Sequence, residues 1–274
     1  MLGKVLKHEF KSTGKLLVPL NLILIGITII GMVVLRLNVF SNDSMALLAI
    51  GFMLLYILGL LAVAIVSFIY IAIRFYKSMF GAEGYLTHTL PVSNMAILNS
   101  KLLVALCWYT ICIMLTIISV VSLICAGFSG MGTPIVWSVI LSQIELVAGV
   151  SVPVLAVWIL GLIIVSSLSG ILMIYASLSI GQLFNKYKVP AAIVAYIVLY
   201  IINQVISTLI TMKISVNSID ESIVLTTTAT GSATLDMAGI YGPLALTSVV
   251  EALIFAVVYY IITYFICKKK LNLD

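Results

Sequence analysis

Long runs of apolar residues, separated by short polar segments, dominate the chain. Six runs are long enough to cross about 30 Å of hydrocarbon, at about 1.5 Å per residue of helix. They cover residues 16–37, 45–73, 102–127, 153–182, 190–212 and 243–267. Because hydrocarbon offers no water to unpaired main-chain groups, each run is expected to be α-helical. The pattern predicts an all-α integral membrane protein, with six transmembrane helices in a single transmembrane domain over residues 1–274.

A seventh apolar stretch, residues 134–150, is nearly long enough to cross as well. It contains Gln143 and Glu145, whose side chains are costly at the centre of a bilayer. Trp137, near its start, suits the headgroup region. We predict an external helix here that is interfacial or re-entrant, rather than a seventh crossing.

The first fifteen residues combine an apolar and a basic helical face. The apolar positions are Leu2, Val5, Leu6 and Phe10, and the polar ones are Lys4, Lys7, His8, Lys11 and Lys15. This spacing predicts an N-terminal amphipathic interfacial helix over residues 1–15 that lies on anionic membrane lipid. A disordered basic tail is the alternative, but the apolar spacing favours the helix.

Composition and charge agree with a membrane location and give an orientation. Of the 274 residues, 63% are hydrophobic and 8% are charged, against about 25% charged in soluble domains. With a cytoplasmic N-terminus, six spans leave only Arg36 and Lys213 outside among the 14 basic residues. Seven spans would divide the basic residues almost evenly. The positive-inside rule therefore favours six spans with both termini cytoplasmic, and makes residues 213–242 the largest external loop. Its mixture of apolar, hydroxyl and glycine residues fits short helices that fold back into the outer leaflet, with a plain polar loop as the alternative.

Several kinds of chemistry have no support in the sequence. It contains no phosphate-binding loop, no zinc-protease motif and no hydrolase elbow, and its two histidines, His8 and His88, stand apart. The four cysteines lie in or beside apolar runs without the spacing of metal ligands. The basic residues follow the membrane boundaries. We therefore expect no enzyme activity, no metal site and no nucleic-acid binding in this chain.

The polar stretch GAEGYLTHTLPVS, residues 81–93, interrupts the apolar pattern between the second and third runs. Gly81 and Gly84 favour a turn, Pro91 ends any helical turn before it, and Ser93 suits the N-cap of the next helix. The charge distribution places the surrounding segment, 74–101, in the cytoplasm. We predict a small rigid element there between two spans.

The motif in this stretch resembles one in a family of transporters. Gly84-Tyr85-Leu86, then Leu90-Pro91-Val92-Ser93, then Lys101 resemble the segment before the third helix of ABC-2-type transporter permeases. The layout of six spans and an N-terminal amphipathic helix is similar along the whole chain, most of all to small permeases of Gram-positive bacteria. Several of these export antimicrobial peptides or give immunity to them. The acidic run common in the family is here FYKSMFGAE, in which only Glu83 matches.

The resemblance implies a function and partners. Segment 74–101 would be the coupling segment, seated in a groove of a separate ABC ATP-binding subunit that binds ATP and Mg²⁺. The contact residues would be Glu83, Tyr85, Leu86, His88, Leu90 and Pro91. A plain solvated loop is the alternative for these residues. The chain would be a permease that exports a peptide, lipid-like or drug-like substrate from the bacterial cell membrane, as a homodimer or with a related permease.

Polar residues inside the apolar runs leave other functions open. Glu251 lies about a third of the way into the last run, and an intramembrane carboxylate marks a functional site or a wet, locally paired interface. Asn203 and Gln204 favour hydrogen bonds between helices. The small residues of 166–170 favour close packing, with a path lining as the alternative. An ion- or proton-coupled secondary transporter that uses Glu251, or a non-transporting scaffold or sensor, is the alternative function.

Overall fold

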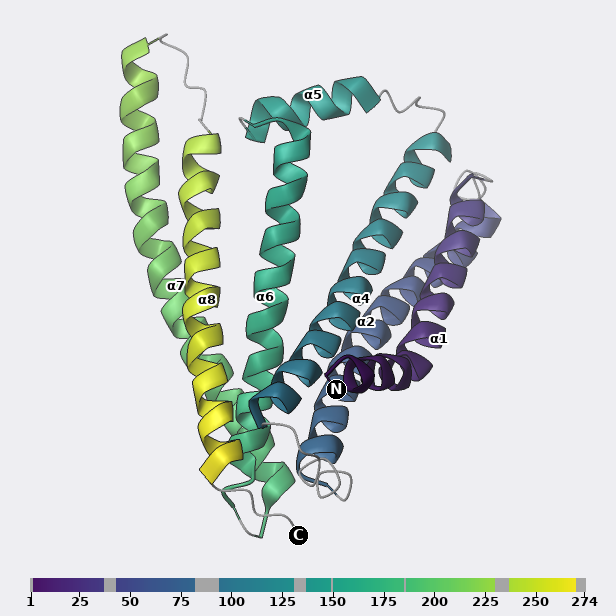
Figure 1. Ribbon diagram of the computed structural model, residues 1–274. Coiled ribbons are helices and arrows are strands. Elements are labelled where there is room, and N and C mark those ends of the chain that lie inside the picture. The colour runs from purple at the N-terminus through teal and green to yellow at the C-terminus, as the bar shows by residue number, and fades with distance from the viewer. Residues whose placement is uncertain are drawn as a thin grey trace. The chain divides into compact units, whose positions relative to one another are not determined.

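The computed structural model describes residues 2–36, 43–81, 94–130, 137–148, 150–184, 186–229 and 237–269. All regular structure in these ranges is helical (Figure 1). The helices are α1 (Leu2–Arg36), α2 (Asp43–Met79), α4 (Asn94–Gly130), α5 (Trp137–Ala148), α6 (Val152–Gly181), α7 (Lys188–Ala229) and α8 (Met237–Lys269). Main-chain contacts divide the chain into two units, residues 1–136 and 137–274, and each is described by itself.

Six of the described helices are long and apolar enough to cross a membrane. The qualifying stretches are Leu6–Arg36, Ile50–Met79, Met95–Phe128, Val152–Gly181, Lys188–Val216 and Gly242–Lys268. Many large apolar side chains on these helices are exposed, as expected of surfaces that face lipid instead of water. The prediction of an all-helical chain with six membrane-length helices is confirmed, and this is the architecture of a multi-pass membrane protein.

In the first unit, α1 packs along α4 and also contacts α2. Leu17 of α1 lies in a buried cluster with Val104, Trp108 and Cys112 of α4. Further along, Leu24 of α1 is buried with apolar residues of α2. The alternation of buried and exposed positions on α1 follows the helical repeat, so one stripe of this helix meets protein and the rest is exposed.

A hydroxyl junction joins the three helices of this unit within the apolar region. The Ser119 hydroxyl of α4 lies 2.6 Å from that of Thr28 on α1 and 2.7 Å from that of Tyr56 on α2. All three residues are buried. In hydrocarbon these groups have no water to bind, so pairing them with one another holds the helices in register.

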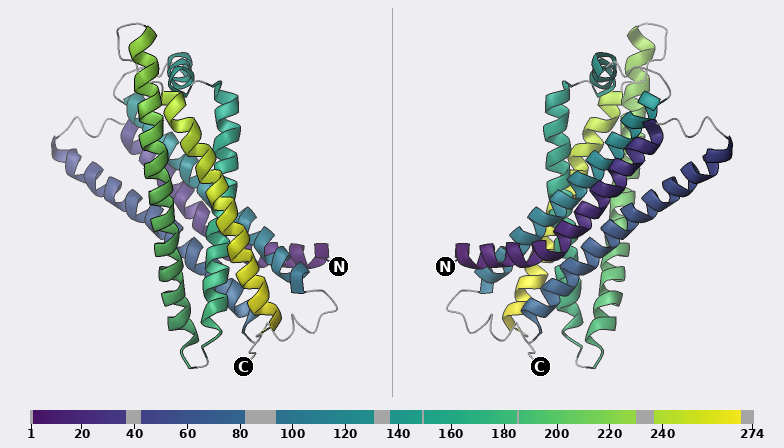
Figure 2. Two further views of the ribbon diagram at one scale, coloured as in Figure 1. Left: turned by 90° about the vertical axis from the view of Figure 1, so that its left-hand side faces the viewer. Right: turned by 90° about the vertical axis from the view of Figure 1, so that its right-hand side faces the viewer.

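The N-terminal residues form the first turns of α1 instead of a separate helix. Figure 2 shows that the ribbon of α1 changes direction after these turns. Leu6 packs against the buried cluster around Trp108, and the Trp108 ring lies against Gly14, where an added Cβ would come within 2.7 Å of it. Part of the apolar face predicted to meet lipid therefore meets α4, because a large indole fits over a glycine.

The second unit is organised around α6, which packs against both α7 and α8. Residues 171–177 of α6 are all buried. At its C-terminal end Gly181 lies so close to α7 that a Cβ added there would approach Ala192 Cβ to 2.6 Å and Lys188 O to 2.7 Å. Within 134–150 the structure has the short helix α5, whose described side chains are all exposed.

The segment predicted to be external as short helices or as a plain polar loop, residues 213–242, is helical in its described parts, 213–229 and 237–242. The helix α7 continues to Ala229, and α8 already begins at Met237. The sequence from 213 to 229 contains no glycine or proline, so nothing in it breaks a helix that has begun. The polar residues after 212 end the apolar run, but they do not end the helix.

Candidate functional site

The predicted contacts for an ATP-binding subunit lie outside the described residues. These are Glu83, Tyr85, Leu86, His88, Leu90 and Pro91, all within residues 82–93. The structure does describe the two helices that this segment joins, up to Gly81 on one side and from Asn94 on the other. The site can therefore be built from its flanks.

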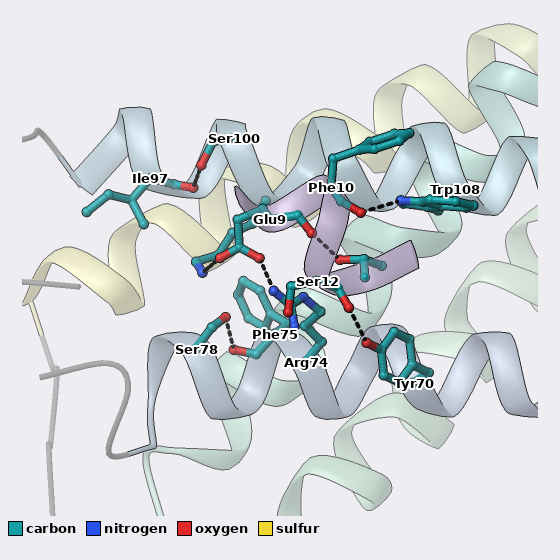
Figure 3. A network of polar contacts seen from close by, with 12 residues as sticks. Glu9, Phe10, Ser12, Tyr70, Arg74, Phe75, Ser78, Ile97, Ser100 and Trp108 are labelled. Atoms are coloured by element: carbon teal, nitrogen blue, oxygen red, sulfur yellow. Dashed lines mark hydrogen bonds and ion pairs between the residues drawn. The ribbon is translucent and has the colours of Figure 1, made fainter. Parts of the chain in front are cut away.

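A carboxylate from α1 joins these two flanking helices (Figure 3). Glu9 Oε2 accepts a hydrogen bond from Arg74 Nη2 of α2 at 2.6 Å. Its other oxygen, Oε1, accepts one from Lys101 Nζ of α4 at 2.9 Å. Arg74 precedes segment 82–93 by two helical turns, and Lys101 follows it by a similar distance. Glu9 of α1 therefore connects the end of α2 with the start of α4, the two helices that segment 82–93 joins.

The ion pairs are well shielded from solvent. The side chains of Lys101, Glu9 and Arg74 are 6%, 15% and 23% exposed. Charges in such a position interact more strongly than pairs on an open surface, and loss of Glu9 would remove the carboxylate that both cations share. The three residues form an electrostatic junction between α1, α2 and α4, the Glu9 junction.

Neighbouring contacts hold α1 in place beside the junction. The Tyr70 hydroxyl of α2 donates to the Ser12 carbonyl at 3.2 Å, and the Trp108 indole of α4 donates to the Phe10 carbonyl at 3.2 Å. The rings of Phe10 and Trp108 stack with centroids 4.8 Å apart. The start of α1 is thus fixed to both partner helices by main-chain and side-chain contacts.

The role of Glu9 is not evident from the sequence. The positive-inside rule places Arg74 and Lys101 in the cytoplasm but gives neither a partner. The available signal was that Glu9 is the single acid among the basic residues at the start of the chain. A lone carboxylate there is expected to pair with a cation, but the sequence does not indicate which one.

A second polar site lies in the other unit, between α6, α7 and α8. A cleft of about 230 Å³ is lined by polar side chains from all three helices: Ser166 and Ser169 of α6, Asn203 and Ser207 of α7, and Glu251 of α8. Ser169 is buried, and Asn203, Ser207 and Glu251 are half-buried. The structure therefore brings together Glu251, Asn203 and part of the small-residue stretch 166–170, which the sequence analysis had considered separately.

Only part of the small-residue stretch 166–170 packs against protein, and the rest lines the cleft. Gly170 lines the cleft, and a Cβ added to it would meet nothing within 4 Å. Ser167, by contrast, is buried away from the cleft lining. The stretch thus presents Ser166, Ser169 and Gly170 to an open space, while its other face is covered by protein.

Gln204 does not join this cleft. It is exposed and lines a neighbouring hollow along α7 with Thr208 and Thr211, which shares only Ser207 with the cleft. Successive residues of a helix point about 100° apart, so Asn203 and Gln204 face different surroundings despite being neighbours. The two were predicted to act alike, and the structure separates them.

The chemistry available in the described residues is that of hydrogen bonding and charge. No group of three or more His, Cys, Asp or Glu side chains in that part of the chain is arranged to hold a metal ion. The cleft offers a carboxylate, an amide and hydroxyls, with no lysine or arginine in its lining. The Glu9 junction, in contrast, is internally paired.

Comparison with known proteins gave no match: no family model matches the sequence, and no curated protein or solved structure matches it. Functional interpretation rests on the residues of the chain and on the resemblance of the motif around Tyr85 and Pro91.

Proposed function

We propose that this chain is the permease subunit of an ATP-driven ABC transporter in a bacterial plasma membrane, and that it exports a peptide, lipid-like or drug-like substrate. A separate ATP-binding subunit supplies the ATP and Mg²⁺ site. Two permease chains, identical or related, enclose the path. Both termini and segment 74–101 face the cytoplasm, and the start of α1 lies at the membrane surface.

The observation that carries this proposal is the Glu9 junction at the base of the motif-bearing segment. Transmission of force from a soluble partner requires that the segment be attached to helices that move together. Arg74 and Lys101, on the two flanking helices, share one carboxylate of α1 at hydrogen-bond distance. A push on segment 82–93 therefore reaches α1, α2 and α4 jointly, which supports a coupling role.

The proposal is tested by isolating the chain with its partners. The affinity-tagged protein is extracted from its native host in mild detergent, and co-purifying proteins are identified by mass spectrometry. An ATPase with a phosphate-binding loop is expected. The double variant Tyr85→Ala and Leu86→Ala should lose this partner or its stimulated ATPase activity, while the protein stays in the membrane.

Lys213→Gln is a matched control, because Lys213 is exposed on α7 and far in sequence from the segment. It should retain the partner and its ATPase activity. Full retention of ATPase stimulation by the Tyr85 and Leu86 double variant would contradict the proposal.

A second candidate is an ion- or proton-coupled secondary transporter. The cleft that contains Glu251 favours it, because a carboxylate in an apolar environment is the usual element of an ion relay. In that case transport would follow an imposed ion gradient in the absence of nucleotide, and Glu251→Gln would abolish it. Gradient-driven uptake into vesicles of the purified chain separates this candidate from the ATP-driven one.

A further inference from the structure

The cleft between α6, α7 and α8 has the chemistry of a binding site. Its polar lining consists of Ser166, Ser169, Asn203, Ser207 and Glu251. Ser169 lies near the middle of the apolar stretch 152–181, and Asn203 near the middle of 188–216. A polar cleft at this depth is surrounded by exposed apolar side chains, such as Ile202 and Val250.

Glu251 is the element that needs explanation. Among the described residues it has no cationic partner, since both ion pairs there are made by Glu9. An ionised carboxylate in an apolar environment is costly unless a cation or several hydrogen-bond donors compensate it. The cleft lining has no lysine or arginine to do so. A positively charged ligand would supply the missing charge.

The remaining lining residues indicate what kind of cation fits. An ammonium group donates three hydrogen bonds, and the Glu251 carboxylate, the Asn203 amide oxygen and the serine hydroxyls are acceptors. Asn203 and Ser207 are four residues apart and so lie on the same face of α7, the face that lines the cleft. The acceptors thus come from three helices, α6, α7 and α8.

The size and the apolar part of the cleft favour an organic cation over a bare metal ion. Its volume of about 230 Å³ is several times the roughly 30 Å³ that one water molecule occupies in the liquid. Met173 and Ala252 add apolar surface beside the polar groups. An ammonium group with several attached carbons would fill this space and place its hydrocarbon against these two residues.

We propose that this cleft binds the primary ammonium group of an amphiphilic ligand, with Glu251 as the counter-ion and Asn203 and Ser169 as hydrogen-bond acceptors. This proposal rests on the proposed transport function for its biological meaning: the substrate of the transporter would be a cationic amphiphile. Binding itself needs neither ATP nor a partner subunit. The two proposals can therefore fail separately.

The test measures thermal stability of the full chain in nanodiscs of phosphatidylcholine. The probes are octylamine, which is protonated at pH 7, octanol, which lacks the charge, and octyltrimethylammonium, which lacks the N–H donors. A ligand that binds the folded state raises the apparent melting temperature by an amount that grows with the ratio of its concentration to its Kd. Octylamine should raise it at lower concentration than either other probe. Any general effect of the probes on the bilayer is common to all variants and cancels in their comparison.

Variants assign the effect to the cleft. Glu251→Gln should raise the octylamine concentration needed for a given shift in melting temperature about tenfold or more, because a charge-assisted hydrogen bond is lost. Asn203→Ala should raise it several-fold. Gln204→Ala is the matched control, a neighbour that faces a different hollow, and should match the wild type. Should Glu251→Gln not fold, Ala252→Phe keeps the carboxylate but fills the cleft, and should weaken the response to octylamine at least as much.

Three results would overturn the inference. One is an equal response of wild type and the Glu251→Gln or Ala252→Phe variant to octylamine. Another is stabilisation by octanol that equals that by octylamine. The third is protection by sodium chloride relative to choline chloride with no response to octylamine, which would assign the cleft to an inorganic ion.

Discussion

Lys101 Nζ lies 2.9 Å from Glu9 Oε1, although 92 positions separate the two residues in the chain. The same carboxylate holds Arg74 of α2 through its other oxygen at 2.6 Å. The start of α1 is thus bound by charge to the helix before segment 82–93 and to the helix after it. A shift of α2 or α4 away from α1 at this level must therefore break a shielded ion pair.

Replacement of Glu9 by glutamine should destabilise the protein by about 1–3 kcal/mol. The glutamine keeps the shape but removes the negative charge that lies 2.9 Å from the nearly buried Lys101 ammonium. The measurement is the free energy of unfolding in mixed detergent micelles by titration with sodium dodecyl sulfate. Lys11→Gln, an exposed charge change in the same part of α1, is the control and should be near neutral.

The double variant Glu9→Gln with Lys101→Gln shows whether charge is the cause. If the loss comes from an uncompensated ammonium, removal of that ammonium as well should recover part of the stability. If the two single losses simply add, the two residues act independently and the junction is not an energetic unit.

Orientation in the membrane can be read from cysteine accessibility. In a background without the four native cysteines, Tyr85→Cys should react with a membrane-impermeant maleimide only after the cells are opened. Lys213→Cys, exposed on α7, should react in intact cells. The reason is the strong excess of basic residues on one side of the six-span arrangement. Labelling of position 85 in intact cells would reverse the orientation and remove the basis for an intracellular partner.

Sequence predicts best those elements whose signal lies in consecutive residues of the chain. Twenty or more consecutive apolar residues leave little choice but a membrane-length helix, and six such helices are present. The polar stretch after residue 212 carries no such signature, since a polar helix and a polar loop can have the same composition. Sequence therefore leaves both short helices and a plain polar loop open for it, and in the structure α7 runs through to Ala229.

The candidate sites were predictable only in part, because they depend on which helix faces lie together. Glu251 and Asn203 were identified singly as polar residues in apolar runs, but their common cleft required the packing of α6, α7 and α8. The Glu9 junction joins residues from three separate helices. Periodicity within a helix gives the face on which a residue lies and says nothing of the partner helix opposite it.

Close contact at Gly181 makes a local prediction for the second unit. Gly181→Ala should destabilise the protein by about 2–3 kcal/mol, because the new methyl group would meet Ala192 and the Lys188 carbonyl within 2.7 Å. Gly161→Ala on the same helix is the matched control. A Cβ there meets nothing within 4 Å, so the better helix propensity of alanine should leave stability equal or improved. Equal effects of the two substitutions would show that α6 and α7 are not in close contact.

The hydroxyl junction gives the corresponding prediction for the first unit. Ser119→Ala removes the group that both the Thr28 and the Tyr56 hydroxyls contact. Hydrogen bonds between membrane helices average about 0.6 kcal/mol, so the loss should be about 1 kcal/mol. Thr116→Ala, on the same helix, is the control, because its hydroxyl bonds to the Cys112 carbonyl of α4 itself. Both variants are compared with wild type in the same detergent titration. A Ser119→Ala protein as stable as the Thr116→Ala protein would mean that the three hydroxyls do not hold α1, α2 and α4 together.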